Sequence, residues 1–172
     1  AEKVSDILRY ADIALYEVKL QGKHGALAYR PDFHNSKRTQ LGFALSDISD
    51  NLPAAFFIYR ADKEDERILY ANQEMLQLTG CTDLDDFMHF TKRQFRNLVH
   101  PEDLAQVEES IWHQIESGMN GYNDYVKYRL AAKDGTYKTI LDYGRIVESE
   151  HYGSVFYVLV VDYGFIKAHY DD

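Results

Sequence analysis

The residues with the clearest metal-ligand chemistry stand together as His100-Pro101-Glu102-Asp103. Imidazole and carboxylate groups bind zinc and other divalent cations. A helix start explains the same residues more simply, because proline suits the first helical position and acidic side chains in the first turn offset the positive end of the helix dipole. No second cluster of ligands stands where it could complete a site, so we predict a helix start and no bound metal.

Two other chemistries would need motifs that the sequence lacks. Serine, histidine and aspartate are all present, but no serine stands in the Gly-x-Ser-x-Gly turn that exposes the nucleophile of many hydrolases. Gly118 and Gly121 lack the third glycine and the preceding strand of a dinucleotide-binding loop. We therefore expect no catalytic residues in this chain.

The composition argues against nucleic-acid and membrane partners. The formal net charge of the 172 residues is −9, whereas nucleic-acid affinity is built largely from clustered lysine and arginine. The longest apolar run, Val155 to Val161, is far shorter than the roughly 20 residues of a membrane helix. The single cysteine, Cys81, cannot form an internal disulfide, which suits a reducing cytoplasm. We expect a cytoplasmic protein whose hydrophobic residues, 45% of the total, can bury a core.

Alternation and turn residues predict an α+β fold from Pro53 onward, with antiparallel strands and flanking helices. The order is two strands, several helices and then three strands. The expected strands cover residues 54–60, 67–71, 122–132, 136–148 and 152–162. Asp134-Gly135 between the third and fourth strands suits the left-handed residues of a type I′ hairpin turn.

The helices between the strands have recognisable ends. Asn72 can accept hydrogen bonds from the free N–H groups of a first turn, and Gly80 suits the left-handed position after a last turn. Another short helix is expected over Leu84 to Met88. The longest helix should run from Pro101 to Gly118 and lie across the sheet. Its apolar side chains fall within one sector of the helix, namely Leu104, Val107, Ile111 and Ile115.

A further helix is expected from Ser36 to Leu52, ahead of the first strand. Its apolar residues are spaced by four, three and four positions, as in a short coiled-coil seam, and are Leu41, Leu45, Ile48 and Leu52. A repeat of under two heptads allows two interpretations. The stripe either packs on its own domain as a cap or pairs with a second chain as a dimer seam.

Residues near the amino terminus resemble the last helix of GGDEF domains, the bacterial fold that makes cyclic di-GMP. That helix reads Ala-Asp-x-Ala-(Leu/Met)-Tyr-x-x-Lys-x-x-Gly, and every position is filled between Ala11 and Gly22, with Gly25 to Tyr29 as the following strand. The Gly-Gly-(Asp/Glu)-Glu-Phe signature of the family occurs nowhere in the chain. The resemblance implies a chain that begins within a cyclase domain and has no cyclase activity of its own.

The rest of the chain, from Asp50 to Asp162, is similar to the PAS family, whose members are sensors or dimerisation modules. The matching residues stand in the family order and are Leu52-Pro53, Ile68-x-Tyr70-x-Asn72, Leu78-Thr79-Gly80, Leu98-Val99-His100-Pro101-Glu102-Asp103, Tyr128-Arg129-Leu130 and Lys133-Asp134-Gly135-Thr136-Tyr137. Two positions depart from the pattern. A tryptophan common shortly after the last hairpin is absent near Thr139, and the closing Asp-Ile-Thr is Asp162-Tyr163-Gly164.

The PAS resemblance implies a five-stranded sheet and helices around a ligand pocket. On the motif alignment, the first two strands direct one set of side chains inward, and the helices and later strands complete the wall. The expected lining is Phe56, Ile58, Ile68, Tyr70, Met75, Leu76, Phe87, Val107, Ile111, Val126, Tyr128 and Ile140. A solid core of aromatic and aliphatic residues has the same appearance in sequence, so a filled interior is the alternative.

Neither haem nor flavin is expected, and the resemblance names no other cofactor. Some PAS proteins bind haem through a helix histidine, but His113 lies 160° from Ile111 on an ideal helix and so faces solvent. His89 stands in no motif. Cys81 follows Gly80 without the Asn-Cys-Arg context of light-sensing relatives, and we expect a small, partly buried thiol.

The sequence therefore predicts four segments. They are a GGDEF tail at 1–34, a linker or cap helix at 35–52, a PAS domain at 53–165 and the start of a linker at 166–172. We expect a regulatory PAS module of a bacterial cyclic di-GMP protein that binds a small ligand, forms a homodimer, or does both. The alternatives are a pure interaction module with a filled core and a part of an active diguanylate cyclase in a longer parent.

Overall fold

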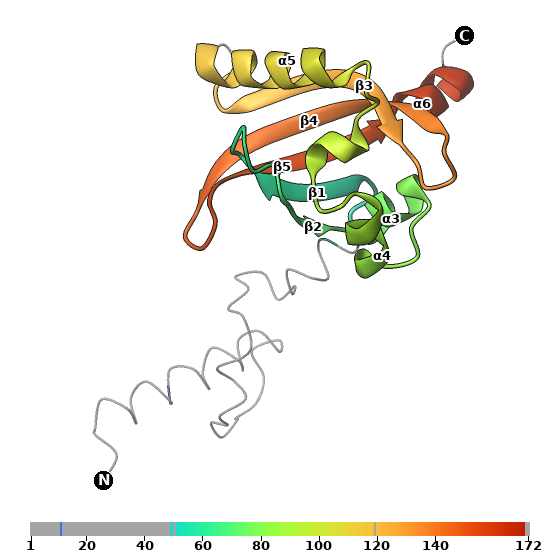
Figure 1. Ribbon diagram of the computed structural model, residues 1–172, viewed down its shortest axis with the longest axis horizontal. Coiled ribbons are helices and arrows are strands. Elements are labelled where there is room, and N and C mark those ends of the chain that lie inside the picture. Colours follow the sequence, from blue (N-terminus) through green and yellow to red (C-terminus); the bar gives the residue numbers. More distant parts are fainter. Residues whose placement is uncertain (1–10, 12–48, 50, 119, 171–172) are drawn as a thin grey trace. The chain divides into compact units, whose positions relative to one another are not determined.

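A five-stranded antiparallel sheet forms the framework of the computed structural model, which describes residues 11, 49, 51–118 and 120–170 (Figure 1). The strands are β1 (Ala55–Arg60), β2 (Ile68–Ala71), β3 (Asn123–Ala131), β4 (Tyr137–Ser149) and β5 (Gly153–Asp162). Their order across the sheet is β2-β1-β5-β4-β3, and every neighbouring pair is antiparallel. The predicted α+β class and the order of its elements are confirmed.

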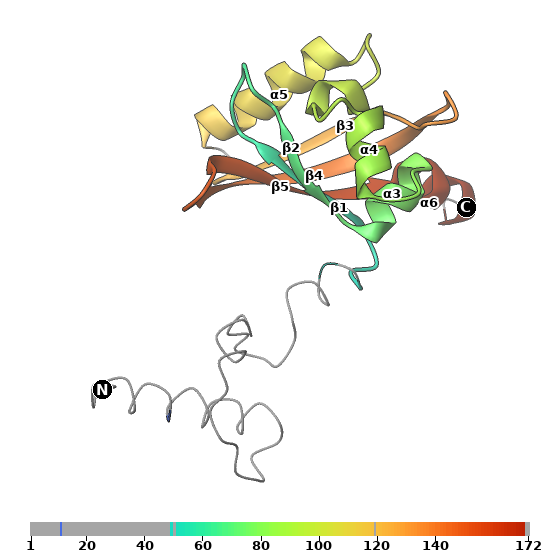
Figure 2. The ribbon, with the colours of Figure 1, turned by 60° about the horizontal axis from the view of Figure 1, so that its bottom comes forward.

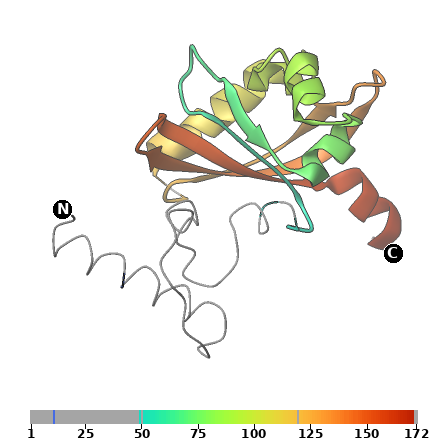
Figure 3. The same cartoon turned by 90° about the horizontal axis from the view of Figure 1, so that it is seen from below.

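The helices between β2 and β3 all lie on one face of the sheet, as Figures 2 and 3 show. They are α3 (Gln73–Thr79), α4 (Leu84–Phe90), the 3-10 helix η2 (Phe95–Leu98) and α5 (Leu104–Ser117). A last helix, α6 (Tyr163–Tyr170), follows β5 directly, so the predicted boundary at residue 165 falls inside a helix. Within the described residues, every helix is too short or too polar to span a bilayer.

The chain divides into two compact units, Ala1–Ser49 and Asp50–Asp172, and the sheet belongs to the second. Apart from Ala11, the predicted GGDEF tail lies outside the described residues, as do Leu41, Leu45 and Ile48 of the predicted seam. Leu52 is described and is partly buried.

Asn72 joins α3 to β1 and to the residue before it. Its side-chain oxygen accepts hydrogen bonds from the backbone N–H groups of Met75 (3.1 Å) and Phe56 (2.8 Å), and its amide nitrogen donates to the carbonyl of Ala54 (3.0 Å). One buried side chain thus caps the helix and fixes the approach of β1. The helix ends at Gly80 with a left-handed φ of 76°, as predicted.

The start of the long helix differs from the prediction. The α-helix begins at Leu104 rather than at Pro101, and residues 101–103 form a turn before it. The acidic pair Glu102 and Asp103 binds Arg129 of β3, with Asp103 Oδ1 2.6 Å and Glu102 Oε2 3.0 Å from Nη2. The two carboxylates thus pair with Arg129, whereas we had expected them to offset the positive end of the helix dipole. Val107 and Ile111 are buried along the predicted apolar face.

The turn between β3 and β4 is also not the type I′ turn that was predicted. Gly135 has a φ of 84°, but Asp134 is not among the described residues with positive φ. The N–H of Gly135 donates to the carbonyl of Ala132 (3.0 Å), as in a type I turn followed by a left-handed glycine. The side chain of Asp134 stabilises this turn by accepting hydrogen bonds from Thr136 N (2.9 Å) and Oγ1 (2.6 Å).

The predicted inward residues of β1 lie on the wrong face. Burial shows that Ala55, Phe57 and Tyr59 point into the core, whereas Phe56 and Ile58 lie on the outer face. Both sets are apolar or aromatic, so hydrophobic alternation could not choose between them.

The prediction for β2 is half correct for a related reason. Ile68 pairs with Tyr59 and is buried, but Tyr70 pairs with Ile58 on the outer face. The register between the two strands shifts at this point, and the additional residue is Leu69. A bulge of this kind reverses the face of every residue after it, which a strict alternation cannot anticipate.

Candidate functional site

The space between the sheet and its helices, where the ligand pocket was predicted, holds a core of packed side chains. Eight of the twelve predicted lining residues are buried there, and Val126 packs against them from a partly buried position. The eight are Ile68, Met75, Leu76, Phe87, Val107, Ile111, Tyr128 and Ile140. None of the twelve lines the surface pockets beside α3, α4 or α5.

Aromatic rings occupy the centre of this interior. Tyr59 stacks on Phe95 at a centroid distance of 4.5 Å and on Phe156 at 5.0 Å, and Phe57 lies 6.1 Å from Phe95. All four side chains are at most 3% exposed. A ligand at this position would have to displace Tyr59, so the described geometry agrees with the filled-core alternative.

Two buried carboxyl groups interrupt this apolar interior. Asp142 of β4 is 2% exposed, and its Oδ2 accepts a hydrogen bond from the hydroxyl of Tyr128 at 2.8 Å. Asp124 of β3 is 1% exposed, and its Oδ1 has no hydrogen-bond partner among the described residues. Burial raises the pKa of Asp124 to about 7, and burial together with the charge of Asp124 raises the pKa of Asp142 further above its usual range.

Gly144 makes room for the Asp124 side chain. The two residues are opposite each other in the β3–β4 ladder. A Cβ added at Gly144 would overlap the Asp124 carboxyl group. The aspartate of the edge strand β3 is therefore held over a glycine of β4, and a larger side chain there would force it to move.

The sequence analysis missed these carboxyl groups although a signal was present. Asp124 has the same strand parity as Val126 and Tyr128, and Asp142 has the same parity as Ile140. Residues two apart in a strand share a face, so both aspartates could have been placed inside.

The outer face of the sheet presents exposed aromatic and aliphatic side chains. Tyr143 of β4 is 40% exposed, and Tyr157 and Leu159 of β5 are each 41% exposed. Phe56, which was predicted to lie inside, contacts Tyr157 and Tyr70 here at centroid distances of 6.0 and 6.3 Å. We call Phe56, Ile58, Tyr70, Tyr143, Tyr157 and Leu159 the outer-face patch.

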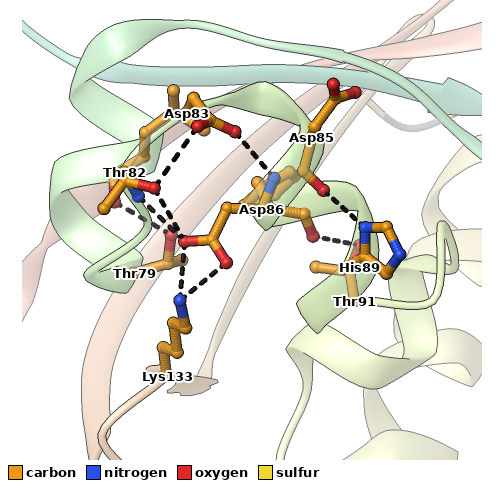
Figure 4. A network of polar contacts seen from close by, with 10 residues as sticks. Thr79, Thr82, Asp83, Asp85, Asp86, His89, Thr91 and Lys133 are labelled. Atoms are coloured by element: carbon orange, nitrogen blue, oxygen red, sulfur yellow. Dashed lines mark hydrogen bonds and ion pairs between the residues drawn. The ribbon is translucent and has the colours of Figure 1, made fainter.

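A polar network joins α4 to the β3–β4 turn (Figure 4). Asp86 forms a two-point ion pair with Lys133 at 2.6 and 2.7 Å and accepts a hydrogen bond from Thr82 N at 3.0 Å. Asp83 caps α4 by accepting from Asp86 N at 2.8 Å. These contacts give the charged side chains of Asp83, Asp86 and Lys133 a structural role.

The two groups considered for cofactors have ordinary surroundings. Cys81, beside this network, is a buried free thiol whose pKa is raised by burial, which disfavours the reactive thiolate. His113 is exposed, as expected from the helix period. His89 is exposed and its Nδ1 lies 3.2 Å from the carbonyl oxygen of Asp85. In the described residues, no group of three or more His, Cys, Asp or Glu side chains could hold a metal ion.

Among the described residues, surface pockets lie beside α3, α4 and α5. One of about 490 Å³ lies between α3, the ends of β1 and β5, and α6, where Phe165 and Ile166 line it. One of about 300 Å³ lies beside α4 at His89. Another, of about 480 Å³, lies between α5 and the β1–β2 turn, where Lys63, Glu66 and Trp112 are among its lining residues.

Comparison with known proteins identifies the family. The family described as PAS fold matches residues 68–161, from β2 to the end of β5. This match covers more than half of the chain, and the chain therefore belongs to the PAS family. A search of curated proteins gives no match.

Solved structures agree on the fold. A PAS domain from Colwellia psychrerythraea is 17% identical and has a TM-score of 0.52, with 68% of this chain and 93% of that chain covered. A PAS domain from a two-component sensor histidine kinase is 15% identical with a TM-score of 0.52, and the match covers 68% of this chain and 91% of that chain. The Rhodobacter sphaeroides LOV protein is 18% identical with a TM-score of 0.53, and the match covers 68% of this chain and 63% of that chain. At these identities the likeness concerns the fold alone.

Proposed function

We propose that this chain is a regulatory PAS module of a bacterial cyclic di-GMP signalling protein and that it acts by self-association. Membership of the PAS family supports a sensory or regulatory role. The GGDEF-like residues from Ala11 to Gly22 support a parent protein of the cyclic di-GMP class. On this proposal residues 1–34 are the tail of the cyclase domain, 35–52 the connecting helix and 53–165 the PAS domain.

The outer-face patch is the observation that carries this proposal. Single exposed apolar residues are normal on a protein surface, but a contiguous set on one sheet face indicates a contact surface. Complete burial of one such side chain contributes about 1.5–3 kcal/mol, and side chains near 40% exposure contribute correspondingly less. Several of them, paired across a two-fold axis, could stabilise a homodimer.

The filled interior favours signalling through protein contacts over signalling through a ligand inside the core. Tyr59, Phe95 and Phe156 already make close ring contacts where a ligand would lie. A pure interaction module is therefore the form of the proposal that this packing supports best. The predicted seam at Leu41, Leu45, Ile48 and Leu52 remains a second proposed site of self-association.

A matched pair of variants tests the proposal. Tyr157→Glu places a charge in the outer-face patch, whereas Tyr152→Glu makes the same change in the β4–β5 turn, where the tyrosine is 54% exposed. Sedimentation equilibrium should give a dimer for the wild type and for Tyr152→Glu, and a dissociation constant at least about ten-fold higher for Tyr157→Glu. A wild-type monomer at tens of micromolar, or equal dissociation constants for both variants, would refute the proposal.

A further inference from the structure

The buried carboxyl groups on the inner face of the sheet alternate along their strands with tyrosines on the outer face. Tyr125 follows Asp124 on β3. Tyr143 stands between Asp142 and Gly144 on β4. The two tyrosines are opposite each other in the β3–β4 ladder, and their rings meet edge to face at a centroid distance of 5.3 Å. Successive side chains of a strand point to opposite faces, so a movement of either strand at its carboxyl group also moves a tyrosine at the outer-face patch.

The two carboxyl groups are buried without a balancing positive charge. Oδ1 of Asp124 and Oδ1 of Asp142 both lack a hydrogen-bond partner among the described residues. The two residues occupy diagonal positions of the ladder, because Asp124 is opposite Gly144 and Asp142 is opposite Val126. The charge of Asp124 opposes the ionisation of Asp142, and no lysine or arginine of the described chain offsets it. This interior therefore accommodates the protonated forms.

The ionisable groups around the pair do not supply the missing charge. They come from β1, β3, the β1–β2 turn, α5 and η2 and are Tyr59, Tyr128, Glu66, Glu108 and Arg96. The hydroxyl of Tyr128 donates a hydrogen bond to Asp142 Oδ2 at 2.8 Å. Arg96 is the cation of this set, and its Nε lies 3.4 Å from Glu66 Oε2, so another carboxylate already engages it. Ionisation of Asp124 or Asp142 would thus leave a buried charge unpaired, which is costly unless water reaches it.

The strand β3 is placed so that water can be admitted by a small movement. Within the sheet it pairs with β4 alone, and α5 runs alongside it (Figure 1). The side-chain amide of Gln114 on α5 donates to the carbonyl of Tyr125 and accepts from its N–H, at 3.1 Å each. These are neutral hydrogen bonds at an exposed position next to Asp124. Their loss would open the edge of β3 where the carboxyl group lies.

We propose that Asp124 and Asp142 form a pH-sensitive switch that sets the position of Tyr143 in the outer-face patch. With the pair protonated, β3 stays against α5 and the patch keeps the arrangement of this structure. When the pair loses a proton, the new charge draws water in at the edge of β3 and displaces the contact between Tyr125 and Tyr143. The effect of the switch on self-association rests on the proposed function, whereas the movement of Tyr143 does not.

The direction of the response follows from the pKa values of the pair. Burial raises the pKa of Asp124 to about 7, and burial together with the charge of Asp124 raises that of Asp142 further above its usual range. The folded values exceed the unfolded ones, so the closed arrangement is favoured at acidic pH and is lost as the pH rises through about 7. Self-association should therefore be tighter at pH 6 than at pH 8. We expect the dissociation constant to rise about five-fold, the lower end of ordinary coupling between two sites.

Sedimentation equilibrium of the 172-residue chain at pH 6, 7 and 8 and constant salt measures this response. Asp124→Asn and Asp142→Asn each replace a carboxyl group by a neutral amide of nearly the same shape, and either should reduce the change in dissociation constant to less than about two-fold. Asp85→Asn, at an exposed position of α4, should follow the wild type. The proposal is overturned if the dissociation constant of the wild type does not change with pH. It is also overturned if both variants keep the full response, which would then belong to the seven histidines.

A second measurement does not require a dimer. In Tyr157→Glu, which carries a charge in the outer-face patch, the ring resonances of Tyr143 in NMR spectra should titrate with the same midpoint as the carboxyl carbon of Asp124. The ring of Tyr152, in the exposed β4–β5 turn, should not follow this titration. Tyr143 resonances that do not follow Asp124 would overturn the switch even if the wild type forms a dimer. A wild-type monomer whose Tyr143 resonances do follow Asp124 would refute the proposed function and leave the switch in place.

Discussion

Replacing Asp124 by Asn should make the stability of the PAS domain less dependent on pH. Burial raises the pKa of Asp124 from 3.8 to about 7 in the folded chain. Its folded pKa is above the unfolded value, so the stabilisation is complete below about pH 4 and is lost as the pH rises through about 7. Asparagine has nearly the same shape and does not titrate.

The size of the effect follows from the size of the pKa difference. One pKa unit corresponds to about 1.4 kcal/mol, so a rise from 3.8 to about 7 gives an upper limit of roughly 4 kcal/mol. Asp142 and Glu66 also have raised pKa values and act in the same direction, so Asp124→Asn should still lose stability as the pH rises, only less steeply than the wild type. The difference between the wild type and Asp124→Asn isolates Asp124, together with its repulsion of Asp142.

Urea unfolding followed by the fluorescence of Trp112, the single tryptophan, measures this difference at pH 5, 6, 7 and 8. The free energy of unfolding should fall with pH in the wild type and fall less in Asp124→Asn. Asp85→Asn, an equivalent change at an exposed position of α4, should follow the wild type. Parallel pH profiles for the wild type and Asp124→Asn would show that the buried carboxyl group does not bind its proton in the folded state.

Three other substitutions test single contacts. Gly144→Ala should cost roughly 1–3 kcal/mol of unfolding free energy because the new methyl group overlaps the Asp124 carboxyl group. Asp124→Ala in the same chain should restore much of this loss. Additive effects of the two substitutions would contradict the contact. Asn72→Ala should lower the free energy of unfolding by roughly 2–4 kcal/mol, since it removes the cap of α3 and the acceptor for a backbone N–H of β1. A decrease below about 0.5 kcal/mol in thermal or urea unfolding would argue against that role. The guanidinium of Arg129 lowers the pKa of Asp103 to about 2, a stabilisation that is present above about pH 4 and is lost as the pH falls through about 2. Arg129→Ala should therefore destabilise the chain much more at pH 7 than at pH 2, and equal destabilisation at both values would exclude the ion pair as the cause.

Local sequence signals predicted those parts of the fold that local interactions determine. Asn72 and Gly80 end α3 as expected, because a cap depends on residues three or four positions away. The buried face of α5 followed from its helical period. The start of α5 could not be predicted in this way, because the acidic residues before it bind Arg129, which is 26 and 27 positions away.

The faces of β1 and β2 show a second limit of prediction from the sequence. Phe56 and Phe57 are equally apolar, so only the surrounding sheet decides which of them is buried. The bulge at Leu69 depends on pairing with β1 and places Tyr70 outside. These two features place Phe56, Ile58 and Tyr70 in the outer-face patch, which explains why this half of the candidate interaction surface was predicted as a pocket wall.

Native mass spectrometry of the purified 172-residue chain, after extensive dialysis, most directly tests whether this PAS domain is a self-associating module with a filled interior. Dialysis removes weakly held surface ligands, while a molecule enclosed in the core would be retained. The account predicts a species with the mass of two unmodified chains. A monomer that carries the additional mass of a retained small molecule would contradict both the filled interior and self-association through the outer face.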